Sequence, residues 1–294
     1  MNILGYDTKN GGRGMTILTL TAIVLGVSLG AGFLGALTGL GGGVVIVPFL
    51  TLALGVDIRY AIGASLVSVI ATSSGAASAY VKEGFSNIRV GMFLEVGTTL
   101  GAIAGAFLAA VVSPPVIAVI FGFVLIVNVF FSLAKHPGPA SDIPAPSDRL
   151  AARLRLDGEY PSLRGIVAYR VQRVLSGLGL MSVAGVLSGL LGIGSGALKV
   201  IAMDRVMRIP FKVSTATSNF MIGVTAASSA GIYLHRGYID PGLTMPVMLG
   251  VLAGSILGTR VLVRTPTRRL RLLFDIVIFA LGVEMILNGL TGKL

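Results

Sequence analysis

Residues 38–48 have the sequence Thr38-Gly39-Leu40-Gly41-Gly42-Gly43-Val44-Val45-Ile46-Val47-Pro48, a glycine-rich turn between a long and a short apolar run. Residues 191–201 repeat it as Leu191-Gly192-Ile193-Gly194-Ser195-Gly196-Ala197-Leu198-Lys199-Val200-Ile201. The glycines match at a constant offset of 153 residues, pairing Gly39, Gly41 and Gly43 with Gly192, Gly194 and Gly196. The sequence therefore predicts two equivalent turns, which the rest of the chain brings together.

The composition is that of a membrane protein. Of 294 residues, 54% are hydrophobic and only 12% are charged, and the mean hydropathy is +0.91. The apolar residues lie in runs of roughly 20, the length at which an α-helix crosses ~30 Å of hydrocarbon. We expect membrane segments at residues 15–38, 44–54, 60–81, 90–112 and 115–134, and at 166–191, 197–203, 213–234, 242–263 and 270–290.

The repeat extends well beyond the two turns. It continues without a gap at the same offset, pairing Ser65 with Ser218, Thr72 with Thr225, Ala77 with Ala230, Tyr80 with Tyr233 and Gly84 with Gly237. In the fourth span of each half, glycines recur every four residues, a spacing that lets helices approach closely. Five segments per half is an odd number, so the halves must enter the membrane in opposite senses. The predicted fold is all-α, with ten segments in two inverted repeats and a short second helix in each.

The basic residues predict the orientation of the chain. Of the 23 lysines and arginines, 17 fall in the connections between spans 3 and 4, 5 and 6, 7 and 8, and 9 and 10. Cytoplasmic connections carry such an excess, so both termini are expected outside the cytoplasm. The net charge of +11 is explained in this way, and no basic run is interleaved with aromatic residues as a nucleic-acid surface would be. We expect a lipid bilayer and no nucleic acid as partners.

Four regions follow from this pattern. They are an external tail (1–14), a first repeat (15–134), a cytoplasmic linker rich in proline, serine and charged residues (135–165) and a second repeat (166–294). Within the linker, Arg153 to Tyr160 alternates around Asp157-Gly158 and is compatible with a small hairpin. Ser147-Asp148 is equally compatible with the cap of a short helix. The sequence is compatible with a monomer or a homodimer.

The two short apolar segments predict a binding site. Residues 44–54 would span only ~16 Å as a helix, and short segments at equivalent places in two inverted halves are typical of the midplane site of a transporter. A helix that begins inside the membrane offers free N–H groups and the positive end of its dipole to an anion. The candidate substrate-binding residues of the turns are Gly41, Gly42, Gly43, Gly194, Ser195 and Gly196. Glycines of this kind also permit tight turns and close helix packing.

Polar residues near the turns extend the candidate site. Lys199 lies inside an apolar segment, where a charge is costly and therefore suggests function; the alternative is that its ammonium snorkels to the surface. Hydroxyl and amide groups that could donate to an oxyanion lie on the third and eighth spans, at Ser65, Ser68, Ser218 and Asn219. Serines in membrane helices also bond to their own backbone.

Two carboxylates are candidates for proton coupling. Glu95 in the fourth span and Glu284 in the tenth lie within apolar segments, where a carboxyl group can carry a proton. Asp275, by contrast, lies four residues from Arg271 and is expected to pair with it. Cysteine is absent, and His136 and His235 lack the spacing of metal ligands. The sequence contains no catalytic triad or nucleotide-binding motif, so neither a cofactor nor a metal nor an enzymatic activity is expected.

These residues carry a resemblance to a known family. Gly-Leu-Gly-Gly-Gly-x4-Pro at Gly39 to Pro48, the Ala64-Ser65 pair, Gly84 and the recurrence of this arrangement resemble the TauE/SafE family of sulfite exporters. The resemblance covers residues 16–134 and 166–290. It implies a bacterial inner-membrane transporter that moves small sulfur-containing oxyanions, usually outwards. The second half departs from the pattern at Ser195, Lys199 and Ile201.

Together, the residues and the resemblance predict a secondary transporter that exports sulfite or an organosulfonate by alternating access, with proton coupling. Import of sulfate, thiosulfate or another small anion remains an alternative, because alternating access runs in either direction. A passive anion channel is a second alternative. A membrane enzyme or sensor is a third class, which no reactive group in the sequence favours.

Overall fold

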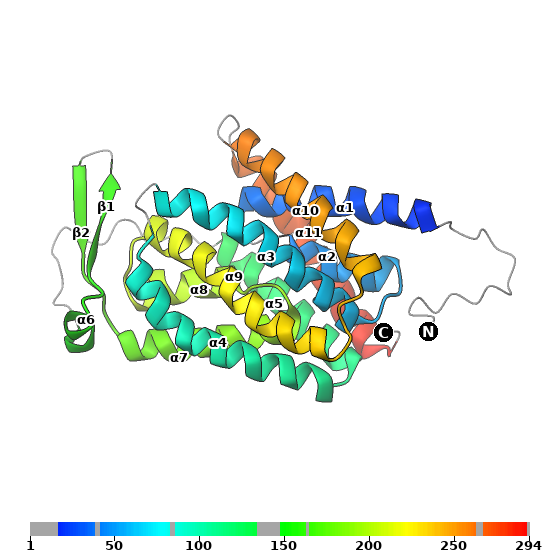
Figure 1. Cartoon of the computed structure of the whole chain (residues 1–294), viewed down its shortest axis with the longest axis horizontal. Helices are drawn as coiled ribbons and strands as arrows, with labels where there is room; N and C mark the ends of the chain where they lie inside the picture. Colours follow the sequence, from blue (N-terminus) through cyan, green and yellow to red (C-terminus); the bar gives the residue numbers. More distant parts are fainter. Residues whose placement is uncertain are drawn as a thin grey trace, which may run out of the picture.

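The computed structural model describes residues 17–38, 42–82, 86–133, 148–162, 165–262 and 267–292. These residues form a helical bundle with one small sheet at its end (Figure 1). In chain order the elements are α1 (Ile17–Thr38), α2 (Gly43–Pro48), η1 (Phe49–Ala53), α3 (Ile58–Lys82), α4 (Ile88–Val111), α5 (Pro114–Leu133), α6 (Arg149–Arg153), β1 (Gly158–Ser162), β2 (Gly165–Tyr169), α7 (Val174–Leu191), α8 (Gly196–Ile201), η2 (Ala202–Val206), α9 (Phe211–His235), α10 (Pro241–Leu262) and α11 (Thr267–Leu290).

Five helices among the described residues are long and apolar enough to cross a membrane. The stretches that meet this criterion are Leu18–Gly35, Ile88–Val111, Pro114–Leu133, Val174–Leu191 and Pro241–Gly258. Each coincides with a segment predicted from the sequence, and none extends more than two residues beyond the predicted bounds. The expectation of a helical, multi-pass membrane protein is therefore confirmed.

Helices α3 and α9 pack against each other, and both are rich in serine and threonine. Most of their described serines and threonines are buried, and several donate to carbonyls one turn earlier in the same helix, as Thr72 does to Ser68 and Ser229 to Thr225. A hydroxyl satisfied in this way can be buried at little cost. The polar faces of these two helices therefore point into the bundle.

Close packing through glycine joins α4 to α7 and α1 to α10. A Cβ on Gly101 of α4 would overlap the Ser182 carbonyl oxygen of α7, and a Cβ on Gly254 of α10 would overlap that of Leu29 in α1. Ser182 and Leu29 are themselves related by the offset of the repeat. The predicted close approach at the glycine rows is thus confirmed, with the same geometry in both halves.

The two short helices each continue into one π-helical turn. Residues 43–53 and 196–206 form the continuous segments α2–η1 and α8–η2. Pro48, at the end of α2, has no N–H to donate and suits the change in hydrogen bonding there. Ile201 occupies the equivalent position, so the proline is not required for the π turn. The second short helix extends three residues past its predicted end at residue 203.

The linker differs from the sequence prediction in two places. The predicted sixth span began at residue 166, but residues 165–169 form β2, and α7 begins at Val174. Ile166 and Val167 are apolar enough to prolong the run, yet they are exposed and pair across to β1. A hairpin does form, although its strands end at Ser162 and begin again at Gly165 and do not turn at Asp157-Gly158. The short helix forms as well, because the Asp148 side chain accepts from Leu150 N.

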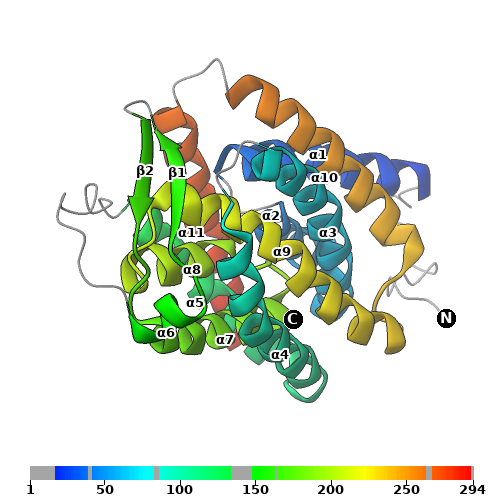
Figure 2. The ribbon, with the colours of Figure 1, turned by 60° about the vertical axis from the view of Figure 1, so that its left-hand side comes forward.

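Residues 148–162 and 165–169, here called the linker module, are attached to the start of several helices (Figure 2). Asn87 caps α4 through Val90 N and donates to the Leu156 carbonyl and the Tyr169 hydroxyl. Asp148 accepts from Val174 N at the start of α7. The module lies at the end of the bundle opposite the start of α1 and the end of α11 (Figure 1).

We predict that Gly101→Ala destabilises the protein by about 1–3 kcal/mol, because the added methyl group would force α4 away from α7. Thermal unfolding in detergent measures this loss. Gly179→Ala, on α7, is the matched control, since a Cβ there meets nothing within 4 Å. Equal unfolding temperatures for the two variants would show that the glycine row does not set the helix distance.

Candidate functional site

The described end of the first glycine turn, at Gly43, lies against the second turn. The Ser65 hydroxyl on α3 donates a 2.7 Å hydrogen bond to the Gly192 carbonyl oxygen. A Cβ on Gly43 would overlap the Ser65 hydroxyl and lie 3.2 Å from the same carbonyl. Helix α3 thus holds the start of α2 against the turn that precedes α8, as predicted for this part of the two turns. Gly41 lies outside the described residues.

The second turn has a left-handed backbone. Gly192 and Gly194 both have φ of +69°, and Ser195 has φ of +49°. For a residue with a Cβ this conformation costs roughly 1–2 kcal/mol. Gly42, the equivalent of Ser195, has an ordinary helical φ of −68°. The two turns therefore differ in backbone as well as in sequence.

The Ser195 side chain is buried without a hydrogen-bond partner among the described residues. It stands at the N-cap position of α8 but does not cap the helix. A buried hydroxyl without a partner is uncommon and calls for an explanation such as a ligand. Ser195 is therefore a candidate donor to a bound anion.

Lys199 is completely buried in α8. Its Nζ atom donates a 2.5 Å hydrogen bond to Thr225 Oγ1 on α9. Since the ammonium group stays inside the protein, the alternative that Lys199 snorkels to the surface is wrong. An ammonium group buried so deeply needs a compensating negative charge.

Glu95 supplies that charge from α4. Thr225 Oγ1 donates to Glu95 Oε1 at 2.6 Å, and Thr99 Oγ1 contacts the same oxygen at 3.2 Å. The other carboxylate oxygen, Oε2, is buried and has no hydrogen-bond partner among the described residues. We call Lys199, Thr225 and Glu95 the charged network. It joins α8, α9 and α4, and its two ends can each take part in ionic chemistry.

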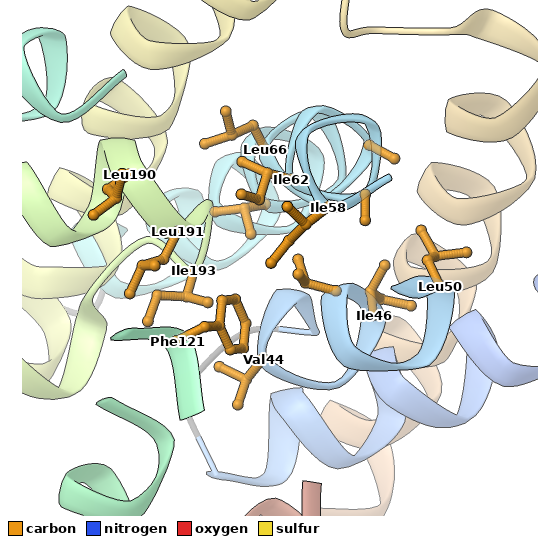
Figure 3. Close-up of a cluster of buried hydrophobic side chains, with 14 of the residues drawn as sticks. Val44, Ile46, Leu50, Ile58, Ile62, Leu66, Phe121, Leu190, Leu191 and Ile193 are labelled. Atoms are coloured by element: carbon orange, nitrogen blue, oxygen red, sulfur yellow. The ribbon is translucent and has the colours of Figure 1, made fainter. Parts of the chain in front are cut away.

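The first half has an apolar counterpart of the charged network. The repeat places Ile46, Thr72 and Met248 at the positions of Lys199, Thr225 and Glu95. Ile46 is fully buried, in an apolar cluster that includes Val44, Leu50 and Ile62 (Figure 3). Only the threonine is shared, so the two halves have similar helices but different chemistry.

The remaining predicted donors bond to the protein backbone or lie beside the turns. Ser218 donates to the Gly196 carbonyl at 3.2 Å, and Ser68 donates to the Ser65 carbonyl at 2.7 Å. Asn219 is half-buried on α9. Ser65 and Ser218 are equivalent in the repeat. The Ser65 hydroxyl donates to the Gly192 carbonyl and the Ser218 hydroxyl donates to the Gly196 carbonyl, so both contact the second turn or the residue that follows it.

The other carboxylates lie away from the charged network. Glu284 is exposed on α11, so the structure does not bring the two proton-coupling candidates together. Asp275 is buried and accepts a 2.9 Å hydrogen bond from Ser132 on α5. The side chain of Arg271, its expected partner, lies outside the described residues.

Sequence reasoning missed the role of Thr225. The repeat matched it with Thr72, and its spacing placed it on the polar face of the eighth span. Helical spacing relates residues of one helix, whereas Thr225 joins a lysine 26 positions away to a glutamate 130 positions away. The available signal was that one lysine, Lys199, and two glutamates, Glu95 and Glu284, lie within apolar segments of the sequence.

The repeat supplies a double-mutant test of the charged network. We predict that Lys199→Ile or Glu95→Met alone destabilises the protein by about 3 kcal/mol, because each leaves an unpaired buried charge. The double variant, which copies the apolar pair of the first half, should lose at least about 1 kcal/mol less than the sum of the two single losses. Chemical unfolding in detergent measures all four proteins. Additive losses would mean that the two charges do not interact.

Comparisons with known proteins agree with this architecture. Residues 24–285 match the family described as "Sulfite exporter TauE/SafE". The probable membrane transporter protein YunE of Bacillus subtilis (strain 168) is 29% identical over 276 residues, which cover 91% of this chain and 97% of YunE. The probable membrane transporter protein MJ0441 of Methanocaldococcus jannaschii is 24% identical over 286 residues, which cover 92% and 97%. No solved structure matches the chain. Since the family match spans both glycine turns and the charged network, the chain belongs to the TauE/SafE sulfite exporter family.

Proposed function

We propose that this membrane transporter exports a small sulfur-containing oxyanion, sulfite or an organosulfonate, across the bacterial inner membrane. Transport is secondary, proton-coupled and proceeds by alternating access around the two glycine turns. The family description and the names of the relatives support a transporter and not an enzyme. The choice of anion rests on the chemistry of the site.

The observation that carries the proposal is the fully buried ammonium of Lys199. In the sequence, Lys199 follows Ser195 by one helical turn. The Ser195 hydroxyl has no partner among the described residues. An oxyanion has several acceptor oxygens, so it can accept from both groups at once. The adjacent start of α8 adds a favourable dipole.

Helix packing supports the inverted ten-segment layout. The repeat relates α1 to α7 and α4 to α10. Helix α1 packs against α10, and their repeat equivalents α7 and α4 also pack against each other. Contacts of α3 with α9 and of α5 with α11 are each converted into themselves. This pattern is what a two-fold axis between the halves requires.

The orientation follows from the linker. With the basic connections in the cytoplasm, the linker module faces the cytoplasm and both termini face the periplasm. The substrate then passes from the linker end of the bundle to the opposite end. Glu95 is the coupling carboxylate in this scheme because it accepts a hydrogen bond from Thr225, which links it to Lys199.

Flux from liposomes tests the proposal. We predict that wild-type protein releases sulfite and methanesulfonate faster than acetate, and that the Lys199→Ile, Glu95→Met double variant loses about tenfold or more of this flux, equivalent to ~1.4 kcal/mol in the transport barrier. Lys212→Met is the control, since it removes an exposed lysine at the start of α9. Faster release of acetate, or no release of either sulfur oxyanion, would refute the proposed substrate class.

Ser195→Gly separates binding from folding. We predict that it stabilises the protein by about 1 kcal/mol, because glycine tolerates the left-handed backbone, and that it weakens sulfite binding. Thermal unfolding with and without sulfite gives both quantities. Arg208→Gly is the matched control, because Arg208 also has a positive φ, of +59°, and its side chain is exposed. This variant should be more stable than the wild-type protein and bind sulfite with unchanged affinity. Unchanged affinity in Ser195→Gly would remove Ser195 from the site.

A further inference from the structure

The hydroxyl group of Thr225 has two acceptors within reach. Glu95 Oε1 lies 2.6 Å from Thr225 Oγ1, and the Met221 carbonyl oxygen of the same helix lies 2.9 Å from it. A hydroxyl has a single proton, so it can donate to only one of them at a time. When Lys199 donates to Thr225, donation onward to Glu95 gives an unbroken path from ammonium to carboxylate. When Lys199 does not donate to Thr225, the Thr225 hydroxyl can donate its hydrogen bond to the Met221 carbonyl instead.

The carboxylate of Glu95 is held at one end only. Oε1 accepts from Thr225 and Thr99, whereas Oε2 has no partner among the described residues. A buried carboxylate with one unsatisfied oxygen depends on its counter-ion to remain ionised. If Lys199 turned to another anion, Glu95 would lose the interaction that balances its charge.

Lys199 and Glu95 are the charges that act on each other in this region. Between their bounds, α7 and α5 carry no charged residue. The other described charges on the surrounding elements stand at the ends of helices or in η2: Arg59, Lys82, Arg89, Lys212, His235, Asp204 and Arg205. The balance of charge at the network is therefore set by the two groups themselves and by whatever binds there.

An entering anion must leave this balance intact. With both groups ionised, the network is neutral, and adding a monovalent anion would give it a net charge of −1 in a low-dielectric interior. Such a charge is expensive to bury. If Glu95 takes up one proton when the anion forms an ion pair with the Lys199 ammonium, the network stays neutral. The bound state then holds Lys199 paired with the anion and Glu95 as a neutral acid.

We propose that each monovalent anion that binds to Lys199 is accompanied by one proton that binds to Glu95, so that anion and proton cross the membrane together. This inference rests on the proposed function and defines its coupling. The proton comes from the water on the side from which the anion enters. Protonated Glu95 donates to Thr225 Oγ1, and Thr225 donates to the Met221 carbonyl, so every donor of the network keeps a partner.

The coupling fixes what drives transport. One negative and one positive charge move in the same direction, so the cycle is electroneutral for a monovalent anion. Membrane potential alone then drives no net flux. Export continues while the outward anion gradient exceeds the inward proton gradient, and it reverses when the proton gradient is the larger.

Methanesulfonate is a suitable probe, because its charge does not change between pH 5 and 9, whereas sulfite itself titrates. In liposomes that contain a pH dye, we expect about one proton to move with each methanesulfonate, and a potassium diffusion potential to leave the flux unchanged. Wild-type flux without proton movement, or flux that follows the potential, would overturn the coupling and leave the proposed function standing. Absence of flux with both sulfite and methanesulfonate would overturn the proposed function, and the coupling with it.

Glu95→Gln provides the matched variant, because glutamine keeps the shape of protonated Glu95. We expect it to carry methanesulfonate without protons and to respond to the membrane potential. Proton movement that persists in Glu95→Gln would assign coupling to another group and overturn the proposal.

A binding measurement on wild-type protein does not depend on that variant. The affinity for methanesulfonate should fall by up to about tenfold for each unit of pH above the range in which Glu95 binds its proton. Proton uptake raises affinity at low pH, so a pH-independent affinity would contradict the coupling. Titration calorimetry in two buffers of different ionisation enthalpy detects the same proton directly.

Discussion

A lysine ammonium can be buried completely inside a helical bundle only if an opposite charge is buried with it. Lys199 meets this condition through Thr225 and Glu95, which come from two other helices. The positions of α4, α8 and α9 are therefore tied to one electrostatic requirement. The glycine contacts of α4 with α7 hold these two helices close together, and the polar faces of α3 and α9 supply hydroxyl groups to the interior.

The two halves of the sequence repeat share helix contacts but differ strongly in chemistry. Gly101 and Gly254 make equivalent contacts in the two halves. By contrast, the repeat aligns Lys199 with Ile46 and Glu95 with Met248. Helix packing constrains residue size at many positions, so both halves retain small residues there. A charged pair needs only one copy, and a second would add two more ions to the apolar interior.

Much of the fold could be predicted because membrane helices are encoded locally. Runs of apolar residues located the helices, the offset repeat located the two turns, and the glycine rows predicted close packing. The start of α7 was mispredicted because Ile166 and Val167 are as apolar as a helix would be, although they belong to a strand. The sequence also singled out Lys199 and Glu95 separately. Their connection through Thr225 could not be predicted, since contacts between distant helices leave no local pattern.

Among the described residues, the linker module has no counterpart at the other end of the bundle. It is tied to α4 and α9 through Asn87, whose side chain donates to the Leu156 carbonyl and whose backbone N–H donates to the Thr217 hydroxyl. Just beyond the module, the Gln172 N–H donates to the Met207 carbonyl that follows η2. In an alternating-access cycle, opening at this end requires these contacts to break, whereas opening at the opposite end does not. Two conformations that the repeat would make equal in energy are therefore unequal. In the proposed cycle, part of the barrier to substrate entry therefore resides in the contacts of the linker module, outside the apolar spans, and responds to solution conditions and not to the lipid.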